Sequence, residues 1–252
     1  MCIRDSREAA RRTVCANNLA QLGLAVHNYE FAREHLPAGV TDTAPGPILT
    51  QPTGIHVGFL VSLLPQLEQR GIAKNFDVKL GTYAKANAPA RMVPIRSLIC
   101  PSSGIFEGVN VAGDAGVTSY AGCHNGTEVS IDSDNNGVLF LNSKITYGDI
   151  YDGSSNTILI GEMIPAADTL GWASGTRASL RNTGSLMDTM GVRGMAPLAP
   201  HEVGGFASDH PGTIMVCLTD GSVQALGFGV DTQLLENLGN REDGAMMGGF
   251  DW

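Results

Sequence analysis

Residues 7–39 read REAARRTVCANNLAQLGLAVHNYEFAREHLPAG, and this stretch decides the fold. Its large apolar side chains recur at steps of three and four residues, which places them in one stripe along an α-helix. They are Leu19, Leu22, Val26 and Tyr29. The Leu36-Pro37-Ala38-Gly39 segment ends the helix, because proline cannot continue the hydrogen-bond ladder. The spacing predicts one amphipathic helix from residue 7 to about residue 34, whose apolar stripe must cover another element.

A second, shorter helix is expected over residues 56–72, HVGFLVSLLPQLEQRGI, with a kink at Pro65. From Arg91 onward the residue pattern changes, and short runs of β-forming residues alternate with clusters of turn-forming residues. Residues 165–205 carry few signals and are interpreted as a long irregular insertion.

The last part of the chain carries clearer signals. Thr219-Asp220-Gly221 stands between TIMVCL and SVQAL, and Asp-Gly between two β runs predicts a hairpin. Asp231 is expected to cap a short helix that follows the hairpin. Together the elements predict an α+β fold with a long N-terminal helix packed on an antiparallel β-sheet and with loop-rich insertions.

Composition narrows the class of protein. The chain has 252 residues, of which 43% are hydrophobic and 16% charged, and this is typical of one large globular domain. The net charge of -9 argues against a nucleic-acid partner, because phosphate contacts need clustered Lys and Arg. A basic cluster does occur at the start, and it fits either the flank of a membrane segment or a solvated first turn. Its members are Arg4, Arg7, Arg11 and Arg12.

The five cysteines form no C-x-x-C pair, which argues against a zinc or thioredoxin-type site. Disulfides in an oxidising compartment and buried free thiols are equally compatible with the spacing. The cysteines that follow Cys2 are Cys15, Cys100, Cys123 and Cys217.

Asp132, Asp134 and Asn136, followed by Gly137, have the spacing of the first half of a calcium loop. Oxygen ligands at alternate positions can converge on one cation. Ser143 stands where an EF-hand needs its bidentate glutamate, so the pattern is incomplete. The competing interpretation is a polar turn between strands, for which Asp, Asn and Gly are well suited.

The Asp152-Gly153-Ser154-Ser155-Asn156-Thr157 string and Glu162 form a second polar cluster. We expect Asp152 and Asn156 to bond local backbone in a tight turn, with Thr157 starting a strand.

His210 stands ten residues before Asp220, and the two side chains are expected to form a structural hydrogen bond. A catalytic pair would also need a nucleophile or a metal, and no G-x-S-x-G motif surrounds any serine.

Four segments, in this order, resemble one bacterial family: REAARRTVCANNLAQLGLAVHNYEFAREHLPAG, IRSLICPSS with TSYAG, DIYDGSSNTILIGE, and FASDHPGTIMVCLTDGSVQAL. The family is the pilin-like group of secreted and surface proteins of unknown function that carry a prepilin-type N-terminal cleavage/methylation signal. Its C-terminal mark is a His, nine residues, and then Asp-Gly, which here is His210 to Asp220-Gly221. The residues matched to the family motifs are Asp152, Gly153, Asn156, Thr157, Glu162, His210, Asp220 and Gly221.

The resemblance implies a pilin or type II secretion pseudopilin-like subunit, structural or secretion-associated, without enzymatic activity. Its partners would be other pilin-like subunits or secretion and assembly machinery, and the membrane through an N-terminal segment. Its location would be the cell envelope, with an inner-membrane anchor and a periplasmic head, or an extracellular filament. Some pseudopilins bind calcium in head loops, so calcium at Asp132, Asp134 and Asn136 is the one cofactor expected.

This chain departs from the family because the prepilin processing site and the apolar run are absent. We therefore expect residues 1–6, MCIRDS, to be a foreign leader, residues 7–35 to be the C-terminal half of a pilin-type helix, and residues 36–252 to be a β-rich head. Two alternatives stay open. One is a membrane-anchored solute- or glycan-binding domain, which an aromatic-lined pocket would favour, and the other is a hydrolase that uses His210 and Asp220.

Overall fold

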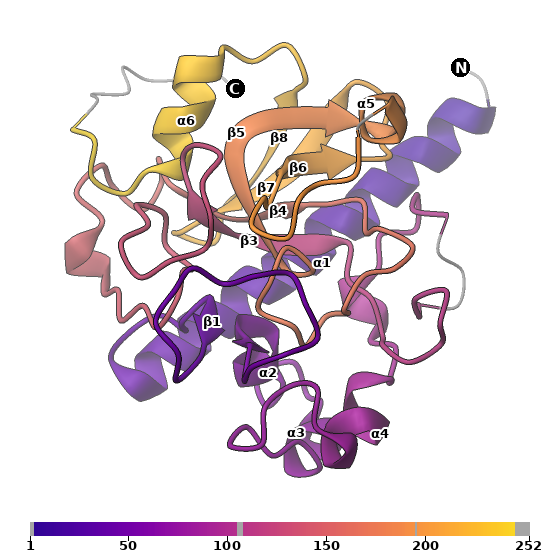
Figure 1. Ribbon diagram of the computed structural model, residues 1–252. Helices are drawn as coiled ribbons and strands as arrows, with labels where there is room; N and C mark the ends of the chain where they lie inside the picture. Colours follow the sequence, from indigo (N-terminus) through magenta and orange to yellow (C-terminus); the bar gives the residue numbers. More distant parts are fainter. Residues whose placement is uncertain (1–2, 105–107, 195, 245–252) are drawn as a thin grey trace.

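The computed structural model describes residues 3–104, 108–194 and 196–244, and it is built around a six-stranded sheet (Figure 1). The strands are β3 (Tyr120–Asn125), β4 (Ile158–Glu162), β5 (Leu180–Asp188), β6 (Gly205–Ser208), β7 (Thr213–Leu218) and β8 (Val223–Gly227). Their order in the sheet is β6-β5-β3-β4-β7-β8. The expected α+β class is confirmed. The sheet is mixed, because β5 pairs in parallel with both β3 and β6 while the remaining pairs are antiparallel.

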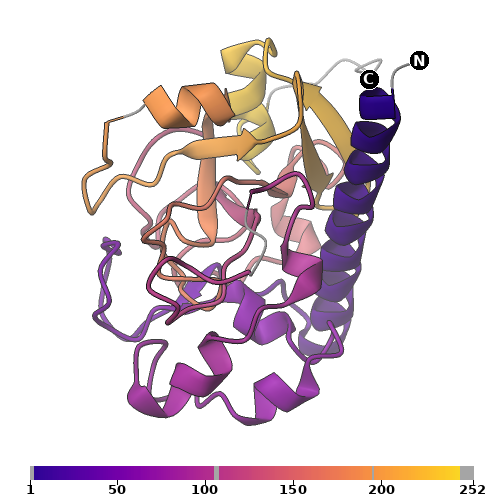
Figure 2. The same ribbon diagram turned by 90° about the vertical axis from the view of Figure 1, so that its right-hand side faces the viewer.

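The long helix α1 (Ile3–Arg33) covers one face of the sheet along β7, β4 and β8. Figure 2 shows it running along the outside of the molecule. Its buried stripe contains the expected leucines, and the stripe begins earlier than expected, with Cys15. The helix ends at Arg33, because Glu34 adopts a left-handed φ of 64° and the backbone turns before Pro37.

The opposite face of the sheet is covered by α6 (Thr232–Gly239). Strand β7 serves both faces, because Val216 and Leu218 pack into the core beneath α6 while Cys217 packs into the core beneath α1. The Asp231 side chain accepts a hydrogen bond from the Leu234 backbone, so the predicted helix cap is confirmed.

The predicted hairpin is also confirmed. Strands β7 and β8 pair in antiparallel register, and the Gly221 backbone donates to the Leu218 carbonyl across the turn. Gly221 has a φ of 85°, which glycine adopts without strain.

The remaining elements are short. They are β1 (Val40–Thr41), β2 (Val57–Gly58), α2 (Phe59–Leu63), α3 (Arg70–Lys74), η1 (Lys85–Asn87), α4 (Ala88–Arg91), η2 (Arg96–Leu98), η3 (Tyr147–Asp149) and α5 (Thr189–Gly194). Among them, α5 lies against β5 and β6.

Two expectations about elements were wrong. Residues 56–72 do not form one kinked helix: Val57 and Gly58 pair with β1, and Pro65 lies in the turn that separates α2 from α3. Residues 165–205 are not an irregular insertion, because they contain the nine-residue strand β5 and the helix α5. Strand β5 has few β-branched residues, and its position between β3 and β6 holds it extended.

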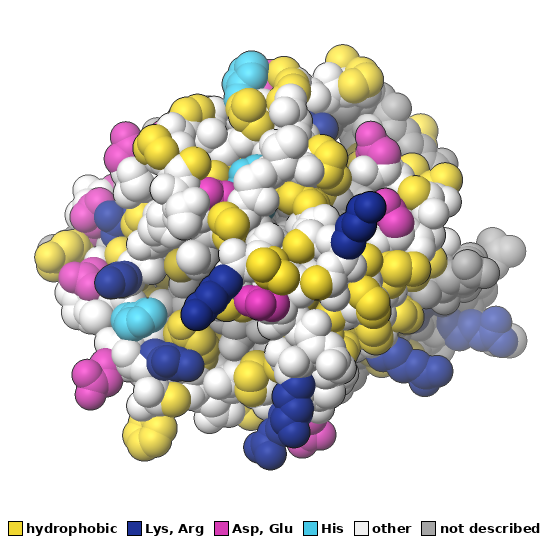
Figure 3. Space-filling view, turned by 60° about the horizontal axis from the view of Figure 1, so that its bottom comes forward, with side chains coloured by type: hydrophobic (Ala, Val, Ile, Leu, Met, Phe, Trp, Pro, Cys, Tyr) yellow, Lys and Arg dark blue, Asp and Glu magenta, His cyan; other side chains and the backbone are white. Residues whose placement is uncertain are grey.

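Within the described residues, no helix combines the length and the apolar content that crossing a bilayer requires. On the face shown in Figure 3, Lys and Arg side chains lie scattered between apolar patches and do not gather into one basic surface. The absence of a nucleic-acid partner stays a prediction.

Candidate functional site

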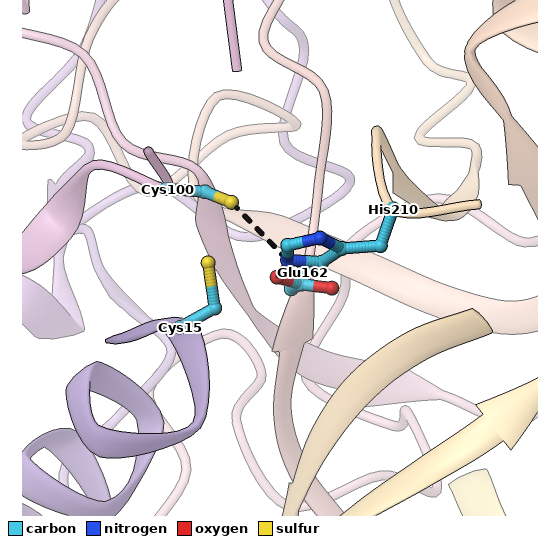
Figure 4. Close-up of side chains that lie close together, drawn as sticks. All are labelled: Cys15, Cys100, Glu162 and His210. Carbon is cyan, nitrogen blue, oxygen red and sulfur yellow. Dashed lines mark hydrogen bonds and ion pairs between the residues drawn. The ribbon is translucent and has the colours of Figure 1, made fainter. Parts of the chain in front are cut away.

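Four side chains that carry metal-binding or nucleophilic atoms meet beneath α1 (Figure 4). They come from four distant segments, and all are buried; their ligand atoms lie within 4.8 Å of one another. We call this set the four-donor cluster, and its members are Cys15, Cys100, Glu162 and His210.

The two cysteines are placed by α1 and by the turn after η2. Cys15 lies one helical turn before Leu19 on the buried stripe. Cys100 is held because its carbonyl accepts hydrogen bonds from both the backbone and the hydroxyl of Ser103, at 3.0 and 2.6 Å. Asn18 donates to the Ile99 carbonyl at 3.3 Å and so ties this turn to α1.

Glu162 is the last residue of β4, and its two carboxylate oxygens have different surroundings. Oε2 accepts hydrogen bonds from the Ser208 hydroxyl at 2.8 Å and from the Met215 backbone at 2.9 Å. Oε1 is buried without a hydrogen-bond partner, although it lies 3.2 Å from Nε2 of His210. One oxygen is therefore held by the sheet, and the other faces the His210 imidazole inside the cluster.

His210 follows β6, and its backbone donates to the Ser208 hydroxyl at 3.1 Å. Its ring lies between two carboxylates. Nδ1 donates to Glu8 on α1 at 2.5 Å, while Nε2 lies 3.5 Å from the Cys100 sulfur. Glu8 also accepts from Arg11 at 2.8 Å, so the carboxylate that orients the ring is itself fixed.

These contacts set the ionisation of the cluster. Burial disfavours the imidazolium, but the contacts with Cys100, Glu162 and Glu8 together raise the pKa of His210 to about 10. A hydrogen bond from the Cys15 thiol lowers the pKa of Cys100 to about 6, and the same bond raises the pKa of Cys15.

Of the residues singled out from the sequence motifs, two belong to the four-donor cluster, Glu162 and His210. The expected hydrogen bond between His210 and Asp220 does not form, because both ring nitrogens of His210 face other groups. The Asp220 carboxylate instead accepts from the backbone and hydroxyl of Ser222, at 2.8 and 2.6 Å, at the exposed tip of the hairpin.

The polar string after Asp152 forms the expected turn. The Asn156 amide donates to the Asp152 carbonyl at 2.9 Å. The Asp220 backbone donates to the Ser154 carbonyl at 3.0 Å, so this turn and the hairpin pack against each other. The motif residues of this string have a structural role.

The loop expected to bind calcium forms a polar turn. The side chain of Asn136 accepts from the Gly126 backbone at 2.9 Å, and that of Asp132 accepts from the Ser133 backbone at 2.7 Å. Asp134 is exposed. These hydrogen bonds occupy oxygens that a cation would need, and calcium binding at this loop stays a prediction.

Sequence reasoning missed Glu8, Cys15 and Cys100, because no short spacing links them. A signal was nevertheless present. Each of the four resembling segments supplies one member of the four-donor cluster, and Cys15 continues the apolar stripe by a step of four residues from Leu19.

The comparisons with known proteins point to a family and to nothing narrower. No curated protein and no solved structure matched the chain. The model of one family, described as "Protein of unknown function (DUF1559)", matches residues 4–233, a range that contains the whole four-donor cluster and α1 from its second residue. The chain belongs to this bacterial family, DUF1559.

Proposed function

We propose that the chain is a pilin-like subunit of the bacterial envelope with a structural or secretion-associated role and no enzymatic activity. In this proposal α1 mediates assembly, and the sheet with its loops forms the exposed head. The observation that carries the proposal is the outer face of α1.

The outer face of α1 lacks the charges expected of a helix that faces only water. No Asp, Glu, Lys or Arg stands between Arg12 and Glu30. Instead this face exposes Val14, Leu24 and Phe31, whose side chains are 46%, 60% and 89% accessible. A helix whose inner face is docked and whose outer face is uncharged is suited to packing against the same helix of another subunit.

The direction of α1 also supports the proposal. Its first turns extend past the sheet at the amino-terminal end (Figure 1), and Asp5, Arg7 and Ala9 are exposed there. An apolar segment upstream would continue the same helix into the inner membrane and leave the head on the periplasmic side. The basic residues Arg7, Arg11 and Arg12 would then lie close to the membrane surface.

Site-specific photo-crosslinking in cells that express the whole gene tests this proposal. A photoreactive residue at Leu24 should yield a crosslinked dimer of the chain. The same residue at Tyr151, which is exposed on the head, serves as the matched control. Dimers from Leu24 and none from Tyr151 would support assembly through α1. A monomer at both positions, with the protein in the soluble cell extract, would reject both assembly and envelope location.

A solute-binding head is the second candidate, favoured by a cavity of 270 Å³ beside β5 and β6. Arg177 and Arg181 line it, and none of its lining residues is aromatic. Guanidinium groups suit an acidic solute, whereas a neutral glycan would stack on aromatic rings. Calorimetry with galacturonate and galactose separates the cases. Heat with the acid alone, lost in Arg181→Gln, would favour this candidate, and no heat with either sugar would reject it.

A further inference from the structure

We propose that the four-donor cluster binds one zinc ion, which fastens α1 to the head. The donor set is two sulfurs, one imidazole nitrogen and one carboxylate oxygen. Each of these is a ligand that Zn²⁺ takes in proteins, and the two thiols favour zinc over calcium or magnesium, which prefer oxygen ligands alone.

The distances between donor atoms fit a tetrahedral ion. With metal–sulfur bonds of about 2.3 Å and metal–nitrogen or metal–oxygen bonds of about 2.05 Å, a tetrahedron separates sulfur from nitrogen by about 3.6 Å and nitrogen from oxygen by about 3.3 Å. The Cys100 sulfur lies 3.5 Å from Nε2 of His210, and that nitrogen lies 3.2 Å from Oε1 of Glu162. These two separations match a tetrahedral ion, and all four ligand atoms lie within 4.8 Å of one another.

Two further features belong to a metal site. Oε1 of Glu162 is buried and faces Nε2 of His210 at 3.2 Å without a well-formed hydrogen bond among the described residues, so a cation bound by both atoms would satisfy both. His210 donates its other ring N–H to Glu8, an arrangement that in metal sites fixes the tautomer and leaves Nε2 free to bind the ion. Glu8 is thus a positioning residue for the histidine ligand.

A disulfide between Cys15 and Cys100 explains less of the geometry. It would need an external oxidant to remove two electrons and two protons from the thiols. It would also leave Glu162 and His210 with no part in the bond, although their ligand atoms lie in the same cluster. Zinc uses all four donors at once, so the convergence of four segments has one cause.

The ion has a route to the site. A groove of 750 Å³ runs between α1 and the segment before and after η2, and Val14, Arg96 and Cys100 are among its lining residues. Zinc binds thiolates and neutral imidazole, so the protons that these groups carry in the metal-free chain are released to solvent on binding. The bound ion would join α1, the turn after η2, β4 and the turn after β6.

The test uses the full chain, purified under reducing conditions. Mass spectrometry of the metal content should find one zinc per chain. After chelation, titration with Co²⁺ should give the intense visible bands of a tetrahedral ion and a thiolate charge-transfer band, both saturating at one equivalent. Chelation should also lower the melting temperature by several degrees, and zinc should restore it.

Two variants with one matched control assign the ligands. Cys100→Ala should reduce the thiolate charge-transfer band to half or less, because Cys15 is then the one thiolate left in the site, whereas Cys123→Ala, which removes a buried thiol elsewhere in the sheet, should keep it whole. Glu8→Gln should keep the spectrum and the one-to-one stoichiometry but weaken metal affinity about 10- to 100-fold.

Either of two results would overturn the proposal. One is a peptide map of the protein from its native cells in which Cys15 and Cys100 are joined as a disulfide. The other is a reduced, folded wild-type chain that takes up neither Zn²⁺ nor Co²⁺. Both measurements use the wild-type chain, so they stand even where a variant fails to fold.

Discussion

The two ends of the contact between α1 and the head use opposite chemistry. Near its amino terminus the helix is held by titratable side chains, since Glu8 and Cys15 meet His210. Further along, the helix packs closely on the hairpin because two glycines, Gly23 and Gly221, carry no side chains. A Cβ on Gly23 would lie 2.8 Å from the Cys217 sulfur, and a Cβ on Gly221 would lie 2.9 Å from Nε2 of His27.

The comparison gives the His-(nine residues)-Asp-Gly motif a physical meaning. His210 marks the polar end of the contact and Gly221 the close-packed end, with β7 running between them along α1. The motif is therefore a two-point attachment for the helix, and its histidine and glycine need not meet. The difference teaches that one motif can combine an electrostatic requirement with a steric one.

The largest effect is expected from breaking the polar end. His210→Ala removes the group between Glu8 and Glu162, so buried Glu162 loses its ion pair with the imidazole while Glu8 keeps its ion pair with Arg11. We expect the free energy of unfolding to fall by about 3–5 kcal/mol, measured by urea denaturation. His201→Ala, at an exposed position, should change it by less than about 0.5 kcal/mol. Equal losses of stability in the two variants would show that His210 stabilises the fold no more than an exposed histidine does.

The stability of the protein at low pH also depends on His124, which lies at neither end of the contact. Measurements of the polar end in acid must therefore account for this residue. Burial lowers the pKa of His124 to about 4, against an ordinary value of 6.5. As the pH falls, the unfolded chain takes up this proton before the folded chain does. The stability of the folded state is therefore unaffected by His124 above pH 6.5 and decreases as the pH falls towards 4. The loss is about 3 kcal/mol.

Urea denaturation at both ends of this pH window measures the effect. The His124→Gln variant should lose about 3 kcal/mol less than wild type on acidification, so what remains belongs to the rest of the molecule. An unchanged pH dependence would mean that His124 does not titrate in this window.

The close-packed end is tested by adding a side chain to α1. Gly23→Val places atoms against Cys217 and the Gly221 backbone, so the free energy of unfolding should fall by about 1–3 kcal/mol. The control is Ala20→Val, which makes the same β-branched side chain on the exposed face of the helix. Similar losses of stability in both variants would mean that helix propensity, and not crowding at Gly23, causes the loss.

The smallest expected effect concerns one hydrogen bond beside the close-packed end. The Tyr147 hydroxyl and Nδ1 of His27 lie 2.5 Å apart, and the rings stack with centroids 5.7 Å apart. Tyr147→Phe keeps the stacking and should cost about 1 kcal/mol in thermal or urea unfolding. Tyr151→Phe, on an exposed ring, should cost nothing measurable. A loss at Tyr151 as large as at Tyr147 would contradict the assignment.

The sequence predicted the parts of the fold that depend on local patterns. Helical spacing identified α1, Asp-Gly identified the β7–β8 hairpin, and Asp231 identified the start of α6. The sequence-based predictions failed where pairing with neighbouring strands determines the local structure. Strand β5 is held by β3 and β6 and has little β propensity of its own, and the 56–72 segment breaks because Val57 and Gly58 pair with β1.

The candidate site shows the same limit more sharply. The local pattern of Asp132, Asp134 and Asn136 led to the prediction of a metal site, but side-chain oxygens of this pattern accept backbone hydrogen bonds in a polar turn. The four-donor cluster has no local pattern, because each donor comes from a different segment and only tertiary packing brings the segments together. Spacing rules for metal ligands detect sites built on one loop or helix and pass over sites of this kind.

The contact between Glu8 and His210 joins residues 202 positions apart, and this has a consequence for synthesis of the chain. The helix is made well before the hairpin that buries it. Until β7 emerges, the apolar stripe of α1 has no sheet to cover, and contacts of such long range form slowly. Until then the growing chain carries an exposed apolar helix, which is a reason for it to be guarded by a chaperone or held at a membrane until the hairpin is complete.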